Sequence, residues 1–340
     1  MHHLRIVYSI THTTVHRNQD NQVDTWKEAR MPPIHFNDRR ESVLVTGATG
    51  FIGQTLVRAL LADGQQVTVL SRDPRRAGRL FEGRVKCIGG MAELPADFKV
   101  DVIVNLAGAR ILGWRWSAAR RKVLLDSRLG VTRKLVDWIA RAEKKPRLMF
   151  SASAIGYYGI QKQGDDTGLT EDSPPQPIFM SQLCQAWETE AQRASDYGVT
   201  VLRMRFGLVL GKGGALPMMM LPIRLGLGGP LGGGRQWLSW IHVDDLIRGI
   251  AHLWNTSDAL TAAYNFAAPG AVTQREFSKT AARILRRPSL IPTPAWPMRL
   301  ILGEQADLLL EGQRVVPDGL QNAKFGFLYP DVQSALKSLY

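Results

Sequence analysis

Short apolar runs alternate with longer segments of helical periodicity along most of the chain, from about residue 43 onward. The apolar runs that predict β-strands cover residues 43–45, 66–70, 85–88, 101–106, 147–151 and 200–204. The segments that predict helices follow the first run up to about residue 64, lie within residues 118–142 and cover residues 183–197. Runs that are apolar throughout are typical of parallel strands covered on both faces. The pattern therefore predicts an α/β fold with a Rossmann-type doubly wound parallel sheet.

The composition changes after the sixth predicted strand. Residues 207–234 are rich in glycine, methionine and proline, and the later chain is helical in pattern with several prolines. We therefore expect a nucleotide-binding domain over residues 42–206, to which residues 236–270 return. A smaller C-terminal substrate lobe would then consist of residues 207–235 and 271–340.

The first 41 residues are polar, mixed in charge and without periodicity, so we expect residues 1–41 to be a disordered extension, within which Met31 offers an alternative start. The opening apolar run is too short for a signal peptide, and no stretch of about 18 apolar residues free of charge occurs. Cys87 and Cys184 are too few for a disulfide framework or a metal cluster. These features predict a cytoplasmic protein with no membrane partner and no metal.

A glycine-rich segment follows the first predicted strand directly. Its sequence from Thr46 onward is TGATGFIG, with Gly47, Gly50 and Gly53 at three-residue spacing, and a helical pattern comes next. Glycines at this spacing let the backbone turn tightly, approach a pyrophosphate without Cβ clashes and pack the helix closely on the strand. Ordinary strand-to-helix connections also contain glycines, but the strand before and the helix after favour a nucleotide site.

The chain is strongly basic, with 43 Lys and Arg against 30 Asp and Glu and a net charge of +13. Arginines gather in residues 72–84 and 110–133, around the expected nucleotide site, and no basic tail carries the excess. No helix-turn-helix, RNP or zinc pattern accompanies the charge. The distribution therefore favours phosphorylated small molecules over nucleic acid as partners.

The end of the second predicted strand indicates which dinucleotide is bound. An acidic residue there binds the ribose 2′-hydroxyl of NAD, whereas an arginine accepts the 2′-phosphate of NADP. This chain has Ser71 and Arg72 at that point, followed by Asp73. A guanidinium makes a strong charge-assisted contact with a phosphate, so NADP(H) is the expected cofactor. In the alternative, Arg72 is a solvated charge and Asp73 binds the ribose.

Several separated motifs resemble those of the extended short-chain dehydrogenase/reductase superfamily, which includes nucleotide-sugar epimerases. Besides the glycine turn, the motifs are NLAG at 105–108, SAS at 151–153 with YYG at 157–159, TEDSP at 170–174 and WIHVDD at 240–245. Narrower phrases are similar to the atypical "epimerase family" branch, an NADP-binding group sometimes labelled as cell-division inhibitors. These phrases are DSR at 126–128, CQAWE at 184–188, RLGLGGP at 224–230 and LEGQR at 310–314. The resemblance extends nearly to the end of the chain.

This resemblance assigns cofactor contacts to individual positions. It places Ser71 and Arg72 at the 2′-phosphate, Leu106 and Ala107 along the dinucleotide, and Arg128 as a further contact. The remaining contacts that it implies lie in the glycine turn and are Gly47, Thr49, Gly50, Phe51 and Ile52. The alternative for Arg128 is a charge on a helix surface.

The resemblance also implies roles for a histidine and several tryptophans. His242 is expected to fix a loop and cap the following helix, with a catalytic role as the alternative. The tryptophans considered for the floor of a substrate pocket, or else for the core, are Trp114, Trp116, Trp237 and Trp240.

The chain departs from the superfamily at the catalytic pair. Members that transfer a hydride normally use Tyr-x-x-x-Lys, in which the lysine lowers the tyrosine pKa and the phenol exchanges a proton with the substrate. Aligned on Glu188, the chain has Met180 and Cys184 at these two positions. Ser153 matches the substrate-orienting serine, and Tyr157 and Tyr158 follow four and five residues later, so either could be a displaced acid; Ser153 and Tyr157 are the catalytic candidates. Structural packing of both tyrosines is the alternative.

Two functions from different classes follow. The first is an NADP(H)-dependent oxidoreductase or epimerase whose small-molecule substrate lies between Arg205, residues 228–234 and the C-terminal lobe. Phosphorylated and nucleotide-linked compounds are the substrates considered. The second is an NADP(H)-binding regulatory or scaffold protein that has lost the catalytic pair.

Overall fold

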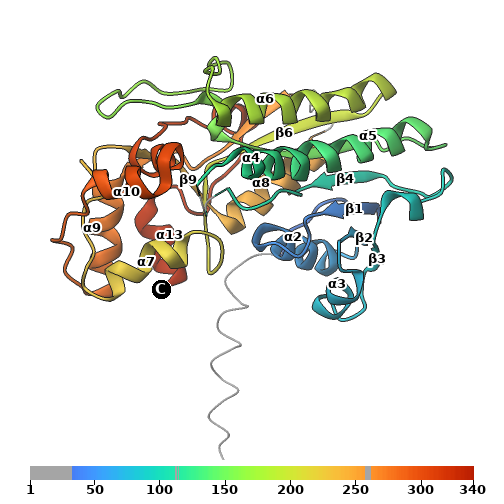
Figure 1. Cartoon of the computed structure of the whole chain (residues 1–340). Coiled ribbons are helices and arrows are strands. Elements are labelled where there is room, and N and C mark those ends of the chain that lie inside the picture. Colours follow the sequence, from blue (N-terminus) through green and yellow to red (C-terminus); the bar gives the residue numbers. More distant parts are fainter. Residues whose placement is uncertain (1–32, 112, 114, 257–261) are drawn as a thin grey trace, which may run out of the picture. The chain divides into compact units, whose positions relative to one another are not determined.

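Seven strands form one parallel sheet in the computed structural model, which describes residues 33–111, 113, 115–256 and 262–340. The strands are β1 (Ser42–Thr46), β2 (Gln66–Leu70), β3 (Lys86–Ile88), β4 (Val102–Asn105), β5 (Leu148–Ala154), β6 (Thr200–Phe206) and β10 (Ala262–Phe266). Their order in space is β10-β6-β5-β4-β1-β2-β3, and each neighbouring pair is parallel (Figure 1). The order reverses between β1 and β4, where sheets of this kind bind ligands beyond their carboxyl ends. The expected Rossmann-type fold is confirmed.

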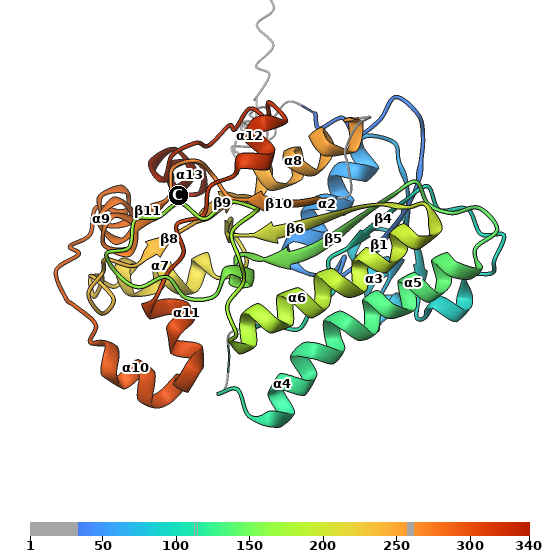
Figure 2. The same cartoon turned by 90° about the horizontal axis from the view of Figure 1, so that it is seen from above.

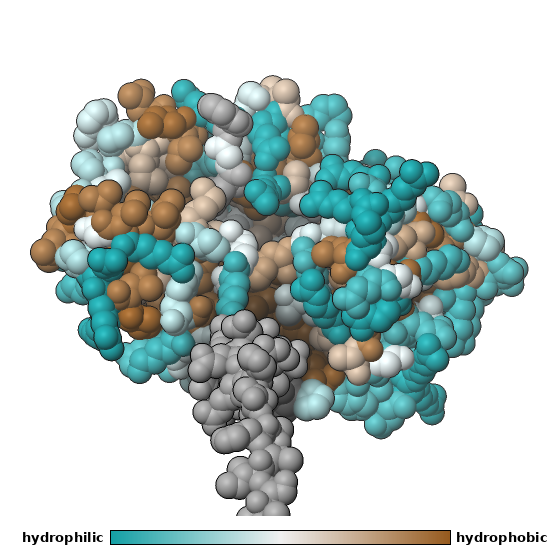
Figure 3. All heavy atoms as spheres, turned by 90° about the horizontal axis from the view of Figure 1, so that it is seen from below, coloured by the Kyte–Doolittle hydropathy of each residue, from teal (hydrophilic) through white to brown (hydrophobic). Residues whose placement is uncertain are grey.

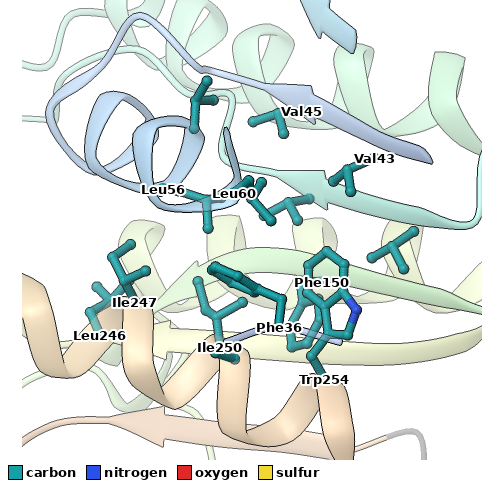
Figure 4. Packing of buried hydrophobic residues seen from close by; sticks show 14 of the residues in the cluster. Phe36, Val43, Val45, Leu56, Leu60, Phe150, Leu246, Ile247, Ile250 and Trp254 are labelled. Atoms are coloured by element: carbon teal, nitrogen blue, oxygen red, sulfur yellow. The ribbon is translucent and has the colours of Figure 1, made fainter. Parts of the chain in front are cut away.

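Helices cover both faces of the sheet (Figure 2). The helices on one face are α2 (Phe51–Ala62), α3 (Pro74–Leu80) and α8 (Val243–Asn255), and those on the other are α4 (Ala118–Leu125), α5 (Val131–Arg141) and α6 (Phe179–Gln192). Successive side chains of a strand point to opposite faces. Val43 and Val45 therefore pack with Leu56 of α2 and Ile250 of α8 (Figure 4), whereas Leu44 packs on the α5 side. Both faces are buried, as the continuously apolar strands predict.

A second group of elements lies beyond the carboxyl ends of β5 and β6, on the side of α7, α9 and α10 in Figure 2. It comprises β7 (Leu208–Leu210), α7 (Leu216–Arg224), β8 (Trp237–Leu238), β9 (Trp240–His242), β11 (Val272–Thr273), α9 (Gln274–Leu285), α10 (Ala295–Leu302), α11 (Asp307–Leu310) and α13 (Val332–Leu339). A separate apolar cluster that includes Trp240, Phe277 and Leu336 holds α7, α9 and α13 together. Helix α12 (Asp318–Asn322) instead packs near β10 through Leu320. Residues 34–340 form one compact unit, so the division into a domain and a lobe stays an expectation.

The end of the expected disordered extension differs from the prediction. Residues 1–32 lie outside the described residues, but Phe36 is fully buried and meets Trp254 edge to face, with ring centroids 5.3 Å apart. The backbone N–H of Phe36 donates to Asp63 at 2.9 Å. The expected disordered extension therefore does not reach residue 41, because the aromatic side chain of Phe36 fills the core between α2 and α8 (Figure 4).

The long helix predicted within residues 118–142 is not continuous. Five residues of π-helix (Asp126–Gly130) separate α4 from α5. Segments of this kind insert an extra residue into a helix and frequently occur at functional sites. Helix α6 also begins at Phe179 rather than at residue 183, and β10 was not among the predicted strands.

Candidate functional site

The glycine turn lies against the end of β4. Gly47 has φ +68°, and a Cβ there would lie 2.5 Å from the carbonyl oxygen of Leu106. A Cβ on Gly53 would lie 2.3 Å from the carbonyl oxygen of Gly47. Both distances are far below van der Waals contact, so only glycine fits at these two positions. The turn thereby brings the start of α2 against the ends of β1 and β4.

The N-terminus of α2 has no side chain capping it. Its N-cap is Gly50, whose backbone N–H donates to the carbonyl oxygen of Gly47 at 3.0 Å, and no acidic residue occupies the first turn. The first N–H groups of a helix have no partner within the helix. In α2 these groups, which belong to residues from Phe51 onward, are available to a phosphate.

The loop after β2 begins beside this turn, because Leu70 pairs with Thr46 across the sheet. Asp73 caps α3, with its carboxylate accepting the N–H of Arg76 at 2.9 Å, and the Ser71 hydroxyl accepts the N–H of Asp73 at 3.2 Å. The Arg72 side chain is exposed and pairs with no carboxylate in the part of the chain that the structure describes. Asp73 is thus engaged in helix capping, while the guanidinium of Arg72 remains available.

Arg128 is buried within the π-helical segment. Its guanidinium donates to the carbonyl oxygens of Leu124, at 3.2 Å, and Ala109, at 3.1 Å, and lies over the Trp187 ring. Among the described residues, no carboxylate forms an ion pair with it. Burial lowers the pKa of Arg128, but an arginine remains charged in proteins. The alternative of a helix-surface charge is therefore wrong, and the geometry leaves a buried cation without a protein anion.

One large cavity, of about 740 Å³, adjoins these groups. The predicted site residues that line it are Gly47, Gly50, Phe51, Ile52, Leu106, Arg128 and Ser153. Its opposite wall comes from β7, α7, the segment of residues 227–239 and the start of α9. Thr49, Ser71, Arg72 and Ala107 lie outside this lining, the first three in the loops that follow β1 and β2.

Ser153 connects the cavity to a buried ion pair. The Ser153 hydroxyl donates to Glu188 Oε1 at 2.6 Å. Arg205 holds the same carboxylate in a bidentate pair, with Nε 2.9 Å from Oε1 and Nη2 2.9 Å from Oε2. All three side chains are buried. Glu188 was not predicted as a site residue, although it lies in the phrase CQAWE at 184–188.

The structure does not bring Arg205 to the substrate cavity. Besides the pair with Glu188, its Nη1 donates to the Tyr158 hydroxyl at 3.0 Å and to the carbonyl oxygen of Glu171 at 2.9 Å. Its N–H groups are thus largely used inside the protein, and burial keeps it 4% exposed. The expected substrate contact by Arg205 does not fit this geometry, because the guanidinium positions Glu188 instead.

Tyr157 also lies away from the cavity. Its ring covers the Arg205 guanidinium at 3.5 Å and lines a separate, smaller pocket with Gln185 and Arg203. Tyr158 is buried, its hydroxyl donates to Asn265 at 2.7 Å, and burial raises its pKa to about 12. The expected pairing of Tyr157 with Ser153 as proton donor therefore does not fit, since the two side chains face different pockets.

The two positions of the missing catalytic pair do line the cavity. Met180 has no exchangeable proton, and burial raises the pKa of the Cys184 thiol to about 12. Among the described lining residues there is no tyrosine, lysine or histidine. A conventional proton relay is therefore missing from this wall.

The tryptophans and His242 have mixed roles. Trp237 lines the cavity, Trp240 is fully buried in the apolar cluster of α9 and α13, and Trp116 packs on Phe179. Trp114 lies outside the described residues. His242 accepts the N–H of Asp244 at 3.1 Å as the N-cap of α8, and burial lowers its pKa to about 4.

Two other features are absent from the part of the chain that the structure describes. No group of three or more His, Cys, Asp or Glu side chains is placed to hold a metal ion. No helix in the described ranges is long and apolar enough to cross a membrane.

Two family models match the chain. Residues 43–267 match the NAD dependent epimerase/dehydratase family, and residues 293–339 match a domain of unknown function, DUF1731. An epimerase family protein of Staphylococcus saprophyticus is 38% identical over 299 residues, which are 87% of this chain and 98% of the relative.

Solved structures are similar along the same length. The human epimerase family protein SDR39U1, isoform 2, crystallised with NADPH, is 35% identical with a TM-score of 0.78, covering 88% of this chain and 98% of that one. A nucleoside-diphosphate sugar epimerase from Corynebacterium glutamicum is 28% identical with a TM-score of 0.70, covering 89% of this chain and 59% of that one.

Proposed function

This chain belongs to the NAD dependent epimerase/dehydratase family, as an atypical short-chain dehydrogenase/reductase, and we propose that it is an NADP(H)-dependent oxidoreductase or epimerase of a small molecule. The observation that carries the proposal is that one cavity adjoins both the glycine turn and the Ser153 hydroxyl. A dinucleotide bound at the turn would therefore share a chamber with a polar group suited to orient a substrate.

The residues present fit NADP(H). A Cβ at Gly47 or Gly53 would clash with the backbone of the turn, so the turn keeps the close backbone packing that a dinucleotide site needs. The uncapped start of α2 offers N–H groups to the pyrophosphate. Arg72 would bind the 2′-phosphate, and the unpaired buried charge of Arg128 would meet an anionic part of the cofactor. The NADPH in the human relative supports the choice of NADP(H) over NAD(H).

Bound NADP(H) would supply or accept a hydride at a substrate carbon. The protein must then deliver a proton to the attached oxygen or remove one from it. The Ser153 proton points to Glu188, which leaves the lone pairs of Oγ to accept a hydrogen bond from a substrate hydroxyl. During oxidation of that hydroxyl, its proton would pass to Oγ as the Ser153 proton moves to Glu188. Arg205 holds the carboxylate in place for this exchange.

The second candidate is an NADP(H)-binding regulatory or scaffold protein. The specific observation in its favour is that Met180 and Cys184 stand where the catalytic pair of the superfamily would be. The two candidates differ in turnover and not in cofactor binding.

The test combines binding with turnover. Calorimetry should show one NADPH bound per chain, and a panel of carbonyl compounds and nucleotide sugars should include one that oxidises it, seen as loss of nicotinamide absorbance. Ser153→Ala should then lower kcat at least about a hundredfold while NADPH affinity is unchanged. Ser195→Ala, outside the cavity, is the control. NADPH binding without turnover across the whole panel would favour the scaffold.

Two finer expectations stay part of this proposal. Residues 42–206 with 236–270 would hold the cofactor, and residues 207–235 with 271–340 would form the substrate side. The free cysteines Cys87 and Cys184 suit a reducing, cytoplasmic location. The substrate class is open: the name of the Corynebacterium glutamicum relative favours a nucleotide-linked substrate, and the lining of the cavity is the observation against which that choice is weighed.

A further inference from the structure

The wall of the cavity opposite the glycine turn is apolar. The side chains that form most of it include Phe206, Leu208, Met219, Ile223, Leu231 and Phe277. They come from β6, β7, α7, α9 and the segment between α7 and β8. Apolar surface that covers a wall of this kind lowers the free energy of binding. A hydrated group placed against it loses hydrogen bonds to water and gains none from the wall.

Most polar side chains on that wall are already bonded within the protein. The Gln274 amide accepts the N–H of Leu231 at 2.7 Å. The Ser239 hydroxyl donates to the carbonyl oxygen of Gln313 at 2.7 Å, and the Ser278 hydroxyl donates to that of Gly229 at 3.2 Å. The hydroxyls of a sugar would find few open partners here. The Ser153 hydroxyl donates its proton to Glu188, and its oxygen can still accept a hydrogen bond in the cavity that the glycine turn also lines.

The charged side chains of the cavity do not suit the diphosphate of a nucleotide sugar in addition to the pyrophosphate of the cofactor. Among the described lining residues, the only arginine is Arg128, beside the glycine turn, and there is no lysine. The acidic lining residue is Glu311, which pairs with Arg299 at 2.8 Å. Arg299, the partner of Glu311, does not line the cavity, so a nucleoside diphosphate on this side would bury its negative charges without a cation in the described lining, which is costly.

The cavity opens onto further apolar surface. Met218 and Leu227 line the cavity and are nevertheless 79% and 55% exposed, so they lie at its mouth. Helix α7 is apolar except for Arg224 at its end, and its Leu216 and Met220, which do not line the cavity, are fully buried. Hydrophobic side chains gather on the side of the molecule that holds α7, α9 and α10 (Figure 3). An apolar chain too long for the cavity could thus continue along its rim.

We propose that the substrate is an uncharged compound with one carbonyl or hydroxyl group and an extended apolar chain, and not a nucleotide sugar. This inference rests on the proposed function. A substrate hydroxyl would donate to Ser153 Oγ, and in the reverse direction a carbonyl oxygen would accept the Ser153 proton, which a protonated Glu188 replaces as the hydride is transferred. The chain of the substrate lies along the wall of β7 and α7.

Chain length is the first variable to test. Calorimetric titration of the NADPH-loaded protein with the 2-alkanones from 2-butanone to 2-decanone should show affinity rising about threefold to fourfold per added CH₂. UDP-glucose should produce no heat of binding at the same concentrations. Binding of UDP-glucose, or alkanone affinities independent of chain length, would overturn the inference.

A charge at the mouth provides the second test. Met218→Asp should weaken binding of 2-decanone at least fivefold while leaving NADPH affinity unchanged. Leu221→Asp is the matched control, since Leu221 lies on the same helix and is exposed but does not line the cavity. Equal effects of the two variants would place the alkanone outside the cavity and contradict the inference.

The experiments distinguish a failure of the proposed function from a failure of the apolar substrate. If the unaltered protein does not bind NADPH, the proposed function fails, and the alkanone series on the cofactor-free protein still decides whether the wall selects apolar chains. If NADPH binds and only UDP-glucose joins it, the proposed function stands and the apolar substrate is wrong.

Discussion

Arg72 is the residue on which the choice of cofactor depends. Its guanidinium is exposed beside the glycine turn, while Asp73 is engaged as the N-cap of α3. We expect the unaltered protein to bind NADPH at least tenfold more tightly than NADH, a difference of about 1.4 kcal/mol, and Arg72→Ala to remove most of it. Calorimetry with both cofactors measures this. Arg84→Ala, whose side chain pairs with the exposed Glu82, should keep the preference, and equal affinities in the unaltered protein would refute the role of Arg72.

Tyr157 provides a test of the corrected site. A positioned proton donor contributes about a hundredfold or more to turnover, so the sequence-based hypothesis predicts a loss of that size in Tyr157→Phe. In the structure the Tyr157 ring covers Arg205 and lines another pocket, and Phe keeps that ring. Turnover of Tyr157→Phe should therefore stay within about twofold of the unaltered protein in steady-state assays. A hundredfold loss in kcat would return Tyr157 to the active site.

At the scale of single elements, the glycine turn between β1 and α2 should tolerate no side chain at Gly47 or Gly53. A Cβ on Gly53 would come 2.3 Å from the Gly47 carbonyl oxygen, so α2 must move away from β1. We expect Gly53→Ala to weaken NADPH binding more than tenfold and to lower the melting temperature. Gly90→Ala is the control because nothing lies within 4 Å of its Cβ position. Unchanged NADPH affinity in Gly53→Ala would show that the dinucleotide does not bind at this turn.

The elements also show what the sequence can and cannot predict. The glycine turn and Arg72 were predictable because each follows a strongly apolar strand and depends on local sequence. The π-helical segment was not, because residues 118–142 have ordinary helical periodicity and the insertion that buries Arg128 is set by packing against Trp187. Tyr157 and Arg205 were misassigned for the same reason. Their pockets depend on how η4 (Ile155–Tyr158) meets β6, which sequence spacing does not contain.

At the scale of the whole molecule, buried acids should make stability sensitive to alkaline pH. Burial raises the pKa of Cys184 and of Tyr158 to about 12, from ordinary values of 9.0 and 10.0. The unfolded chain releases these protons first, so stability is fully present below about pH 9 and falls as pH rises towards 12. Each group contributes a slope of roughly 1 kcal/mol per pH unit within its window.

Urea unfolding at several pH values checks this. Tyr158→Phe should flatten the decline above about pH 10, and Cys184→Ala should flatten it from about pH 9. Tyr197→Phe, at an exposed position, should leave the slope as it is. A pH dependence that is identical in all three variants would mean that neither buried group is linked to folding.

The proposed function requires that one cavity bring NADP(H) to a substrate that it oxidises or reduces. This is measured in a single turnover with NADPH carrying deuterium at the transferable position, mixed with a 2-alkanone that binds the protein. We expect one deuterium at the carbinol carbon of the resulting alcohol, found by mass spectrometry, together with an equal loss of nicotinamide absorbance. Stoichiometric NADPH binding with no deuterium in any product, across alkanones, aldehydes and nucleotide sugars, would contradict the proposed function.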